Sequence, residues 1–339
     1  MASIPAVGEV SPPRVASDPR QDPMLGEVLD GRYAITEEVG KGAMATVYKA
    51  QLLGRDDIVA VKVLNGGAQE EARVRFQREA ELMQSLRSLN TVRVHGFGEI
   101  SDRPYMVMEL LEGDTLEELL ERRGRLDAGL TLQLMWQVCH SLEEAHSAGA
   151  VHRDIKPANI FVVQERGREV VKVLDFGIAK ITRRTGGRRV RAITEVGSVM
   201  GTPTYLSPEQ AANAPVAPQT DFYSLGAVAF HCLAGRPPFL GPPSEVIHGH
   251  ESKPPPSFAT LPEPVEVPRQ VESLVMRLLA KRPERRPANA AALRFQIEEI
   301  LHELTRPEAE GRRGSSAMLA AVAVAVIVAS IAVIVWAVT

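Results

Sequence analysis

The sequence has few aromatic residues, few cysteines and little net charge. Aromatic residues make up 5% of the 339 positions, and the formal net charge is −3. A surface that stacks nucleic-acid bases needs aromatic side chains, and binding to phosphate backbones needs a basic field, so we expect no nucleic-acid partner. The two cysteines, Cys139 and Cys232, lie far apart in apolar stretches. We predict that both are core residues of a protein from a reducing compartment.

The two ends of the chain have opposite character. The first 25 residues contain five prolines and no apolar run, which excludes a secretory signal and predicts a disordered segment over 1–30. Residues 317–338 carry no charge, and eleven of these 22 residues are Val, Ile or Leu. A helix of this length measures about 33 Å, enough to cross a bilayer core of about 30 Å. Insertion is worth roughly −3 to −7 kcal/mol, and a buried core helix of this length without charges is rare.

The flanks of this span predict its orientation. Arg306, Arg312 and Arg313 precede it, all within the linker 305–316, and the positive-inside tendency then places the preceding domain in the cytoplasm. Alanines recur at every fourth position from Ala317 to Ala329. Such a stripe permits close helix packing, so a homodimer through this face stays open beside a chance pattern in an alanine-rich segment.

Between the ends, the sequence predicts an α+β domain with a small β-rich part and a larger helical part. The first part alternates short apolar runs with one amphipathic helix, and the second has long helical periodicity interrupted by proline-rich loops. The expected strands are Tyr33–Val39, Ala45–Gln51, Ile58–Leu64, Val92–Gly96 and Tyr105–Leu110. The expected helices are Glu70–Leu86, Leu130–Ala148, Asp221–Ala234, Glu272–Leu279 and Ala288–Leu304, and the expected surface loops are Pro237–Pro243 and Pro254–Pro268.

The run from His152 to Asn159, followed by Asp175-Phe176-Gly177, carries the strongest chemical signal. Asp154 can accept the proton of an attacking hydroxyl, whereas Asn159 and Asp175 offer the oxygen ligands that Mg²⁺ prefers. Phosphoryl transfer requires positioning and charge neutralisation more than covalent chemistry, and these residue types supply both.

Two more strings point to a nucleotide. Gly40-Lys41-Gly42 joins two expected strands, and glycines let backbone amides approach phosphates, although glycine pairs also mark ordinary hairpins. Lys62 ends the apolar run Val59-Ala60-Val61, and Glu79 lies on the following expected helix. Taken alone, Lys62 and Glu79 are each more simply explained as charged side chains that face solvent.

In this order and spacing, the strings resemble those of protein kinases, and residues 205–210 and 234–239 are similar to bacterial Hanks-type membrane serine/threonine kinases. The resemblance covers roughly residues 33–304. It implies a two-lobed fold, with lobes over about 31–110 and 111–304, plus one C-terminal transmembrane helix. It also implies ATP, Mg²⁺ or Mn²⁺, protein substrates, and a single-pass location in the inner membrane with the kinase domain on the cytoplasmic side.

The resemblance also assigns residue roles. Asp154 would be the base, Lys156 would reach the γ-phosphate, and Lys62 paired with Glu79 would hold the α- and β-phosphates. Metal ligands would be Asn159 and Asp175. The ATP site would comprise Val39, Gly40, Lys41, Gly42, Val47, Ala60, Lys62, Met108, Glu109, Leu111 and Phe161. Structural roles would fall to Arg153, Thr202, Glu209, Asp221 and Arg286.

The stretch between Asp175 and Glu209 is the expected regulatory segment. It is rich in arginine and offers hydroxyls for phosphorylation, with Thr194 matching an activation-loop site of bacterial members; the other candidates are Ser198, Thr182 and Thr185. A solvated basic loop without phosphate is the alternative.

Three rival interpretations remain. One is a pseudokinase-type membrane scaffold, which would require a lost metal or phosphate ligand. Another is a kinase for small molecules, against which the segment Gly201–Glu209 argues because that pattern positions a peptide. Finally, the sequence describes either a tail-anchored kinase or a chain that stops short of an extracytoplasmic domain.

Overall fold

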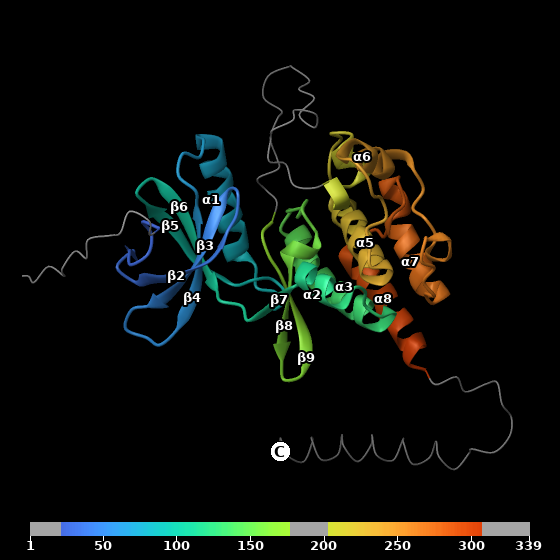
Figure 1. Ribbon diagram of the computed structural model, residues 1–339, viewed down its shortest axis with the longest axis horizontal. Helices are drawn as coiled ribbons and strands as arrows, with labels where there is room; N and C mark the ends of the chain where they lie inside the picture. The colour runs from blue at the N-terminus through green and yellow to red at the C-terminus, as the bar shows by residue number, and fades with distance from the viewer. Residues whose placement is uncertain (1–21, 177–202, 307–339) are drawn as a thin grey trace, which may run out of the picture. The chain divides into compact units, whose positions relative to one another are not determined.

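The computed structural model describes residues 22–176 and 203–306, and its first part is an antiparallel sheet with one helix (Figure 1). Within these residues the sheet has six strands in the order β1-β2-β3-β4-β6-β5. The strands are β1 (Val28–Leu29), β2 (Tyr33–Lys41), β3 (Ala45–Leu52), β4 (Ile58–Leu64), β5 (Val94–Ile100) and β6 (Arg103–Glu109), and the helix is α1 (Glu70–Ser85).

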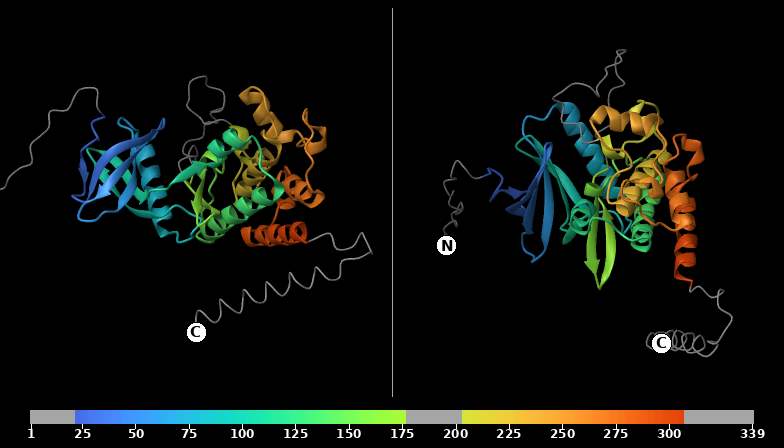
Figure 2. Two further views of the ribbon diagram at one scale, coloured as in Figure 1. Left: turned by 60° about the horizontal axis from the view of Figure 1, so that its bottom comes forward. Right: turned by 45° about the vertical axis from the view of Figure 1, so that its right-hand side comes forward.

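Both faces of this sheet bury apolar side chains. One face forms a core around Ile35, Tyr48, Val61 and Tyr105. The other packs against α1, whose Phe76, Ala80 and Met83 belong to a cluster with Leu64 and Met106. Figure 2 shows α1 running alongside the strands. The central strand β4 is therefore buried on both sides, which explains its continuous apolar sequence.

The second part is mainly helical and begins with a small sheet in the order β7-β8-β9. Its strands are β7 (Gly113–Thr115), β8 (Ile160–Glu165) and β9 (Arg168–Val173). The helices are α2 (Leu116–Arg123), α3 (Ala128–Ser147), α4 (Pro208–Ala211), α5 (Pro218–Ala234), α6 (Pro243–Ser252), α7 (Arg269–Leu278) and α8 (Ala290–Thr305). Short 3₁₀ turns occupy Pro157–Asn159, Pro203–Tyr205, Phe258–Thr260 and Pro283–Arg285.

Helix α5 is the centre of this helical part. Every side chain from Thr220 to Phe230 is buried, which agrees with its nearly uninterrupted apolar sequence. It ends at Gly235, which adopts the left-handed conformation (φ 69°) that glycine tolerates best. Asp221 is a buried charge in its first turn, and such a group needs partners.

The structure corrects the expected elements at several places. Residues 22–30, expected to be disordered, join the sheet: Met24 and Leu29 are buried, and Asp22 accepts a hydrogen bond of 2.7 Å from the Tyr48 hydroxyl. The hairpin β8–β9 and helix α6 were not expected. Helix α6 begins at Pro243, because proline suits the first helical turn. The stretch 254–268 is not wholly superficial, since Phe258 and Leu261 are buried.

The expected membrane span lies outside the described residues. No helix within 22–176 and 203–306 is long and apolar enough to cross a bilayer. The chain divides into compact units at Ile300 and Leu301, and of the second unit the structure describes only residues 301–306.

Candidate active site

The loop between α3 and β8 holds Asp154, and a buried carboxylate on α5 fixes its backbone. Asp221 is fully buried and accepts hydrogen bonds from the amides of His152 (2.8 Å) and Arg153 (2.7 Å). The ring of His146, at the end of α3, lies 2.7 Å from the same carboxylate through Nε2. The first turn of a core helix therefore sets the path of the loop.

The buried ring of His152 links this loop to the strand that leads to Asp175. Its Nε2 lies 2.9 Å from the carbonyl of Leu174, which can only accept, so Nε2 carries the proton. Its Nδ1 is then free to accept from the amide of Asp154 at 3.3 Å. Burial lowers the pKa of His152, which keeps this neutral tautomer in place.

Asp154 lies beside Lys156 and Asn159, the two other site residues expected in this loop. The Lys156 ammonium is 3.3 Å from the Asp154 carboxylate. The side-chain amide of Asn159 donates to the Asp154 carbonyl at 2.8 Å and approaches its carboxylate at 3.3 Å. Since the Asn159 N–H groups face Asp154, its amide oxygen is the atom left for a cation.

Lys62 reaches Asp175 more closely than it reaches Glu79. Its Nζ lies 2.7 Å from Asp175 Oδ1 and 4.0 Å from Glu79 Oε1. Burial acts to lower the pKa of Lys62, but these two carboxylates hold it above the ordinary value. Burial likewise acts to raise the pKa of Asp175, and the Lys62 ammonium keeps it low.

Glu79 is the more deeply buried of the two carboxylates, with 6% of its surface exposed. Burial raises the pKa of Glu79 to about 8, against the opposing effect of Lys62. The expected pair of Lys62 with Glu79 is therefore present only at the outer limit of an ion pair, and a second carboxylate competes for the lysine.

Two residues of this centre have unusual backbone conformations. Arg153 has φ 66° and Asp175 has φ 31°, in the region that side chains other than glycine rarely adopt. Such strain persists only where surrounding contacts impose it. Contacts hold both residues in place: the Arg153 amide donates to Asp221, and the Asp175 carboxylate binds Lys62.

The residues fit a hard divalent cation that is held largely by other ligands. Asn159 and Asp175 each offer one oxygen-bearing side chain, and the Leu174 amide donates to the Asn159 carbonyl at 2.9 Å, which joins their two segments. Among 22–176 and 203–306, no group of three or more His, Cys, Asp or Glu side chains could hold a metal. Mg²⁺ normally takes few protein ligands and completes its shell with phosphates and water.

Strand register brings the expected nucleotide residues to one face of the first sheet. Val47 pairs with Lys62, Ala60 pairs with Met108, and Gly40 pairs with Val47. Directly paired residues point to the same side of a sheet. Val47 and Met108 are half-buried, as are Leu111 and Phe161 beyond this sheet, whereas Val39 is 51% exposed. These apolar surfaces fit a planar aromatic ligand.

Glu109 was expected among the nucleotide ligands, yet its carboxylate has protein partners. It accepts from the Arg93 amide at 2.7 Å and from the Lys172 ammonium at 2.8 Å. Lys172 lies on β9 in the helical part, so this side chain joins the two parts. Any contact of Glu109 with a nucleotide would then come from its backbone.

Asn65 is a site residue that sequence reasoning missed. The loop after β2 is closed by a bond from the Gly42 amide to the Ala45 carbonyl (2.9 Å). Asn65 donates to the carbonyls of Gly42 (3.0 Å) and Ala43 (3.2 Å), and accepts from Thr46 (2.9 Å). A lone asparagine after a strand usually marks a turn, so the sequence held no signal for this role.

The segment around Glu209 is anchored by a buried ion pair. Arg286 binds Glu209 through two nitrogens at 2.7 and 3.0 Å, and the Thr220 hydroxyl adds a third bond at 2.7 Å. Burial acts to raise the pKa of Glu209, but Arg286 holds it below its ordinary value. Removing one partner would leave a buried charge uncompensated.

Gln210 is a second missed residue. Ser207 caps α4 by accepting from the Gln210 amide (3.3 Å), and the Gln210 side chain bonds back to the Ser207 amide (3.1 Å). The same side chain donates to the Arg153 carbonyl at 2.8 Å, which ties this segment to the Asp154 loop. The spacing Ser-x-x-Gln is a capping-box pattern and could have revealed the cap.

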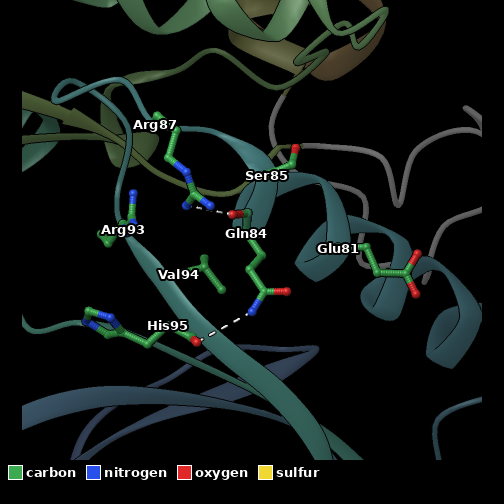
Figure 3. Close-up of a pocket in the computed structure, with 7 residues that line it drawn as sticks. All are labelled: Glu81, Gln84, Ser85, Arg87, Arg93, Val94 and His95. Carbon is green, nitrogen blue, oxygen red and sulfur yellow. Dashed lines mark hydrogen bonds between the residues drawn. The ribbon is translucent and has the colours of Figure 1, made fainter.

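A separate hollow lies away from these residues. It measures about 440 Å³ and lies beside the end of α1 and the start of β5 (Figure 3). Its lining is polar and includes Arg87, Arg93 and His95. It shares no residue with the predicted site.

The expected phosphorylation residues Thr182, Thr185, Thr194 and Ser198, together with Thr202, lie outside the described residues.

Comparison with known proteins gives one consistent result. Residues 33–302 match the model of the protein kinase domain. The chain is 36% identical over 313 residues to serine/threonine-protein kinase pkn3 of Myxococcus xanthus, covering 89% of this chain and 56% of that protein. It is 35% identical to PknB of Mycolicibacterium smegmatis over 83% of this chain and 44% of the other. For PknL of Mycobacterium tuberculosis the identity is 34%, over 85% and 70% respectively.

A solved structure extends this similarity to the fold. The PknI kinase domain of Mycobacterium tuberculosis superposes with a TM-score of 0.59 at 26% identity, covering 81% of this chain and 98% of that chain. The chain spans only 32–56% of the length of three Myxococcus xanthus relatives.

Proposed function

The chain belongs to the protein kinase family, and from this premise we propose that it transfers the γ-phosphate of ATP to serine and threonine hydroxyls of proteins. The observation that carries the proposal is the convergence of Lys62, Asp154, Asn159 and Asp175 from three segments of the chain. The relatives pkn3, PknB and PknL bear the name serine/threonine-protein kinase, which supports a catalyst over a pseudokinase scaffold.

In this mechanism, Asp154 orients the acceptor hydroxyl and takes its proton as the new O–P bond forms. The bond between the γ-phosphorus and the β–γ bridging oxygen breaks, and ADP leaves with that electron pair. Lys156, beside Asp154, faces the charge on the transferred group. Lys62 holds the phosphates that stay on ADP. The transition state is loose, so alignment matters more than the basicity of Asp154.

We infer that Mg²⁺ is the preferred cation, because Asn159 and Asp175 offer oxygen donors. When bound there, the cation would neutralise phosphate charge. Asp175 would then face both the cation and Lys62, and repulsion between the two cations would favour movement of Lys62 toward Glu79. The 4.0 Å separation of Lys62 and Glu79 leaves that pair within a small side-chain adjustment.

We further propose that residues 317–338 anchor the chain in the inner membrane with the kinase domain in the cytoplasm. The apolar length and the arginines before it support this topology. Signalling from the membrane surface would follow, with other proteins as substrates. Homodimer formation through the alanine stripe belongs to the same proposal, since kinases held side by side can phosphorylate each other's Thr194.

Incubation of the purified full chain with Mg-ATP, followed by mass spectrometry, tests the catalytic proposal. We expect new phosphates on hydroxyls in 177–202, with Thr194 the leading candidate, and none in Asp175→Ala. Asp154→Asn should lose transfer by at least about 100-fold while still binding nucleotide, because the amide neither aligns and accepts the hydroxyl proton as a carboxylate does nor pairs with Lys156. An Asp154→Asn variant as fast as the parent would contradict the role of Asp154. Transfer to sugars or alcohols with none to protein would favour a small-molecule kinase instead.

A further inference from the structure

Helix α6 carries two histidines with opposite environments, and only one contacts the segment before α4. His248 is exposed, whereas His250 is fully buried. His250 Nε2 lies 2.8 Å from the Thr204 carbonyl, and Nδ1 lies 3.0 Å from the Tyr223 hydroxyl on α5. A side chain from α6 thus fixes the backbone of the turn Pro203–Tyr205, five residues before the anchoring Glu209.

The chemistry of the partners sets the direction of every bond in this chain. The Thr204 carbonyl can only accept, so His250 Nε2 must donate and Nδ1 must accept. Tyr223 must then donate its proton to Nδ1, which leaves its oxygen to accept from Lys281 Nζ at 3.1 Å. An ammonium has only donors, so the series runs one way, from Lys281 to Thr204.

Lys281 is itself held firmly at the start of the series. Its ammonium donates to the carbonyls of Gly249 (2.8 Å) and His250 (2.9 Å), and it lies 4.6 Å from the centre of the Phe239 ring. Burial lowers the pKa of His250 to about 4, so the ring stays neutral near pH 7. In a protonated ring, Nδ1 would also carry a hydrogen and could no longer accept from the Tyr223 hydroxyl.

The stretch between α7 and α8 holds the other end of the segment. Arg286 pairs with Glu209, lies 4.9 Å over the Tyr223 ring, and donates to the Lys281 carbonyl at 3.1 Å. The stretch 204–209 is therefore fixed at both ends, by His250 at Thr204 and by Arg286 at Glu209, and both of these residues contact Tyr223. The Glu209 end is an ion pair, whereas the Thr204 end depends on the tautomer of one histidine.

We propose that His250 is a positioning residue for protein substrates: through the series Lys281–Tyr223–His250 it fixes the Thr204 carbonyl and thereby the backbone on which the acceptor peptide rests. This inference rests on the proposed protein kinase activity. It does not require His250 to touch the substrate, and it assigns to α6 a function that no sequence motif indicated.

Three variants of the full chain test the proposal. His250→Ala removes both bonds, whereas His250→Gln keeps one donor and one acceptor and can restore the series. His248→Ala on the same helix is the matched control, because His248 is exposed and its ring lies beside Ser252 of α6 rather than Thr204. All three are first compared by thermal unfolding, and only folded variants are used.

Hydrogen exchange gives a measurement that does not depend on activity. We expect amides of 203–211 to exchange at least about 5-fold faster in His250→Ala, and at the parental rate in His250→Gln and His248→Ala. Unchanged exchange in His250→Ala would overturn the proposal, even if the chain proves not to be a kinase.

Kinetics then test the consequence for substrate. The acceptor is a synthetic peptide of residues 188–201, which contains Thr194 and Ser198. We expect the KM for this peptide to rise roughly 5- to 10-fold in His250→Ala, with kcat and the KM for ATP within about 2-fold, and recovery in His250→Gln. A similar change in kcat, in the KM for ATP and in the KM for the peptide would contradict a positioning role. So would a KM for the peptide that stays raised in His250→Gln. An inactive parent would instead count against the proposed function and leave the exchange result to decide.

Discussion

At the scale of single residues, Asp175 has two competing roles. It is the closest partner of Lys62 and also an expected cation ligand, and its pKa is held low so that it stays charged for either. Burial raises the pKa of Glu79 to about 8, so this carboxyl is mostly protonated near pH 7. A closer approach of the Lys62 ammonium would lower that pKa and favour the charged carboxylate. The motifs predicted the pair of Lys62 with Glu79 but not the preference of Lys62 for Asp175, because distances between separate segments depend on packing that no local pattern records.

Asn65 gives the first prediction at this scale. Asn65→Ala removes three hydrogen bonds that hold the loop Gly42–Thr46 and should raise the KM for ATP about 3- to 10-fold with little change in kcat. The reason is that a looser loop must be ordered when phosphates bind. Steady-state kinetics at varied ATP and saturating peptide measure the effect.

Asn65→Asp separates the contributions of these bonds. The carboxylate still accepts from Thr46 but cannot donate to the carbonyls of Gly42 and Ala43, so its KM for ATP should rise as in Asn65→Ala. A parental KM in both variants would show that the loop does not depend on Asn65.

At the scale of elements, the sequence predicted those whose apolar periodicity is long. Strands β2, β3 and β4 and helices α1, α3, α5, α7 and α8 lie within a few residues of the expected positions. The expectation failed for α6 because, of its three buried residues Val246, Gly249 and His250, only Val246 has an apolar side chain, so its sequence shows no apolar stripe. It failed for residues 22–30 because their burial depends on Tyr48 and its neighbours in the sheet.

Helices α5 and α6 also predict a pH dependence of stability. Burial lowers the pKa of both His231 and His250 to about 4, so between pH 6.5 and 4 the unfolded chain binds more protons than the folded one. The stabilising effect is complete above pH 6.5 and is lost as pH falls. Relative to its value above pH 6.5, the free energy of unfolding at pH 5 should be lower by about 2 kcal/mol for each of these histidines, because the unfolded chain binds a proton that the folded chain does not.

His250→Gln isolates one of these contributions, since glutamine does not titrate. Urea unfolding at pH 7 and pH 5 should show a loss of stability in this variant about 2 kcal/mol smaller than in the parent. His248→Gln, an exposed position on the same helix, should lose as much as the parent. Equal losses in all three chains would mean that His250 is not held neutral by the fold.

At the scale of the whole molecule, the sheet and the helical part are joined by side chains as well as by the chain itself. Glu109 of β6 binds Lys172 of β9, Lys62 binds Asp175, and Glu144 of α3 accepts from the amides of Arg87 and Ser88 at 2.7 Å each. The sequence assigned Lys62 and Asp175 to one nucleotide site but did not predict their ion pair, and the other two contacts involve surface-type charges whose partners only the fold selects.

The proposed membrane anchor determines how the chain should fractionate. Eleven Val, Ile and Leu residues within 317–338 make insertion favourable by roughly −3 to −7 kcal/mol, and no charge in that segment opposes it. The expressed full chain should therefore remain in the membrane fraction after an alkaline carbonate wash, whereas a chain ending at Arg312 should be released. Substituting Val326 and Ile327 by lysine in the full chain adds about 2.5–3.5 kcal/mol for each charge near the centre of the span and should also release it.

Protease added to spheroplasts should leave the domain 22–306 intact, because the arginines before the span keep it inside. Release of the unmodified chain by carbonate would remove the anchor from the proposal without affecting the catalytic site.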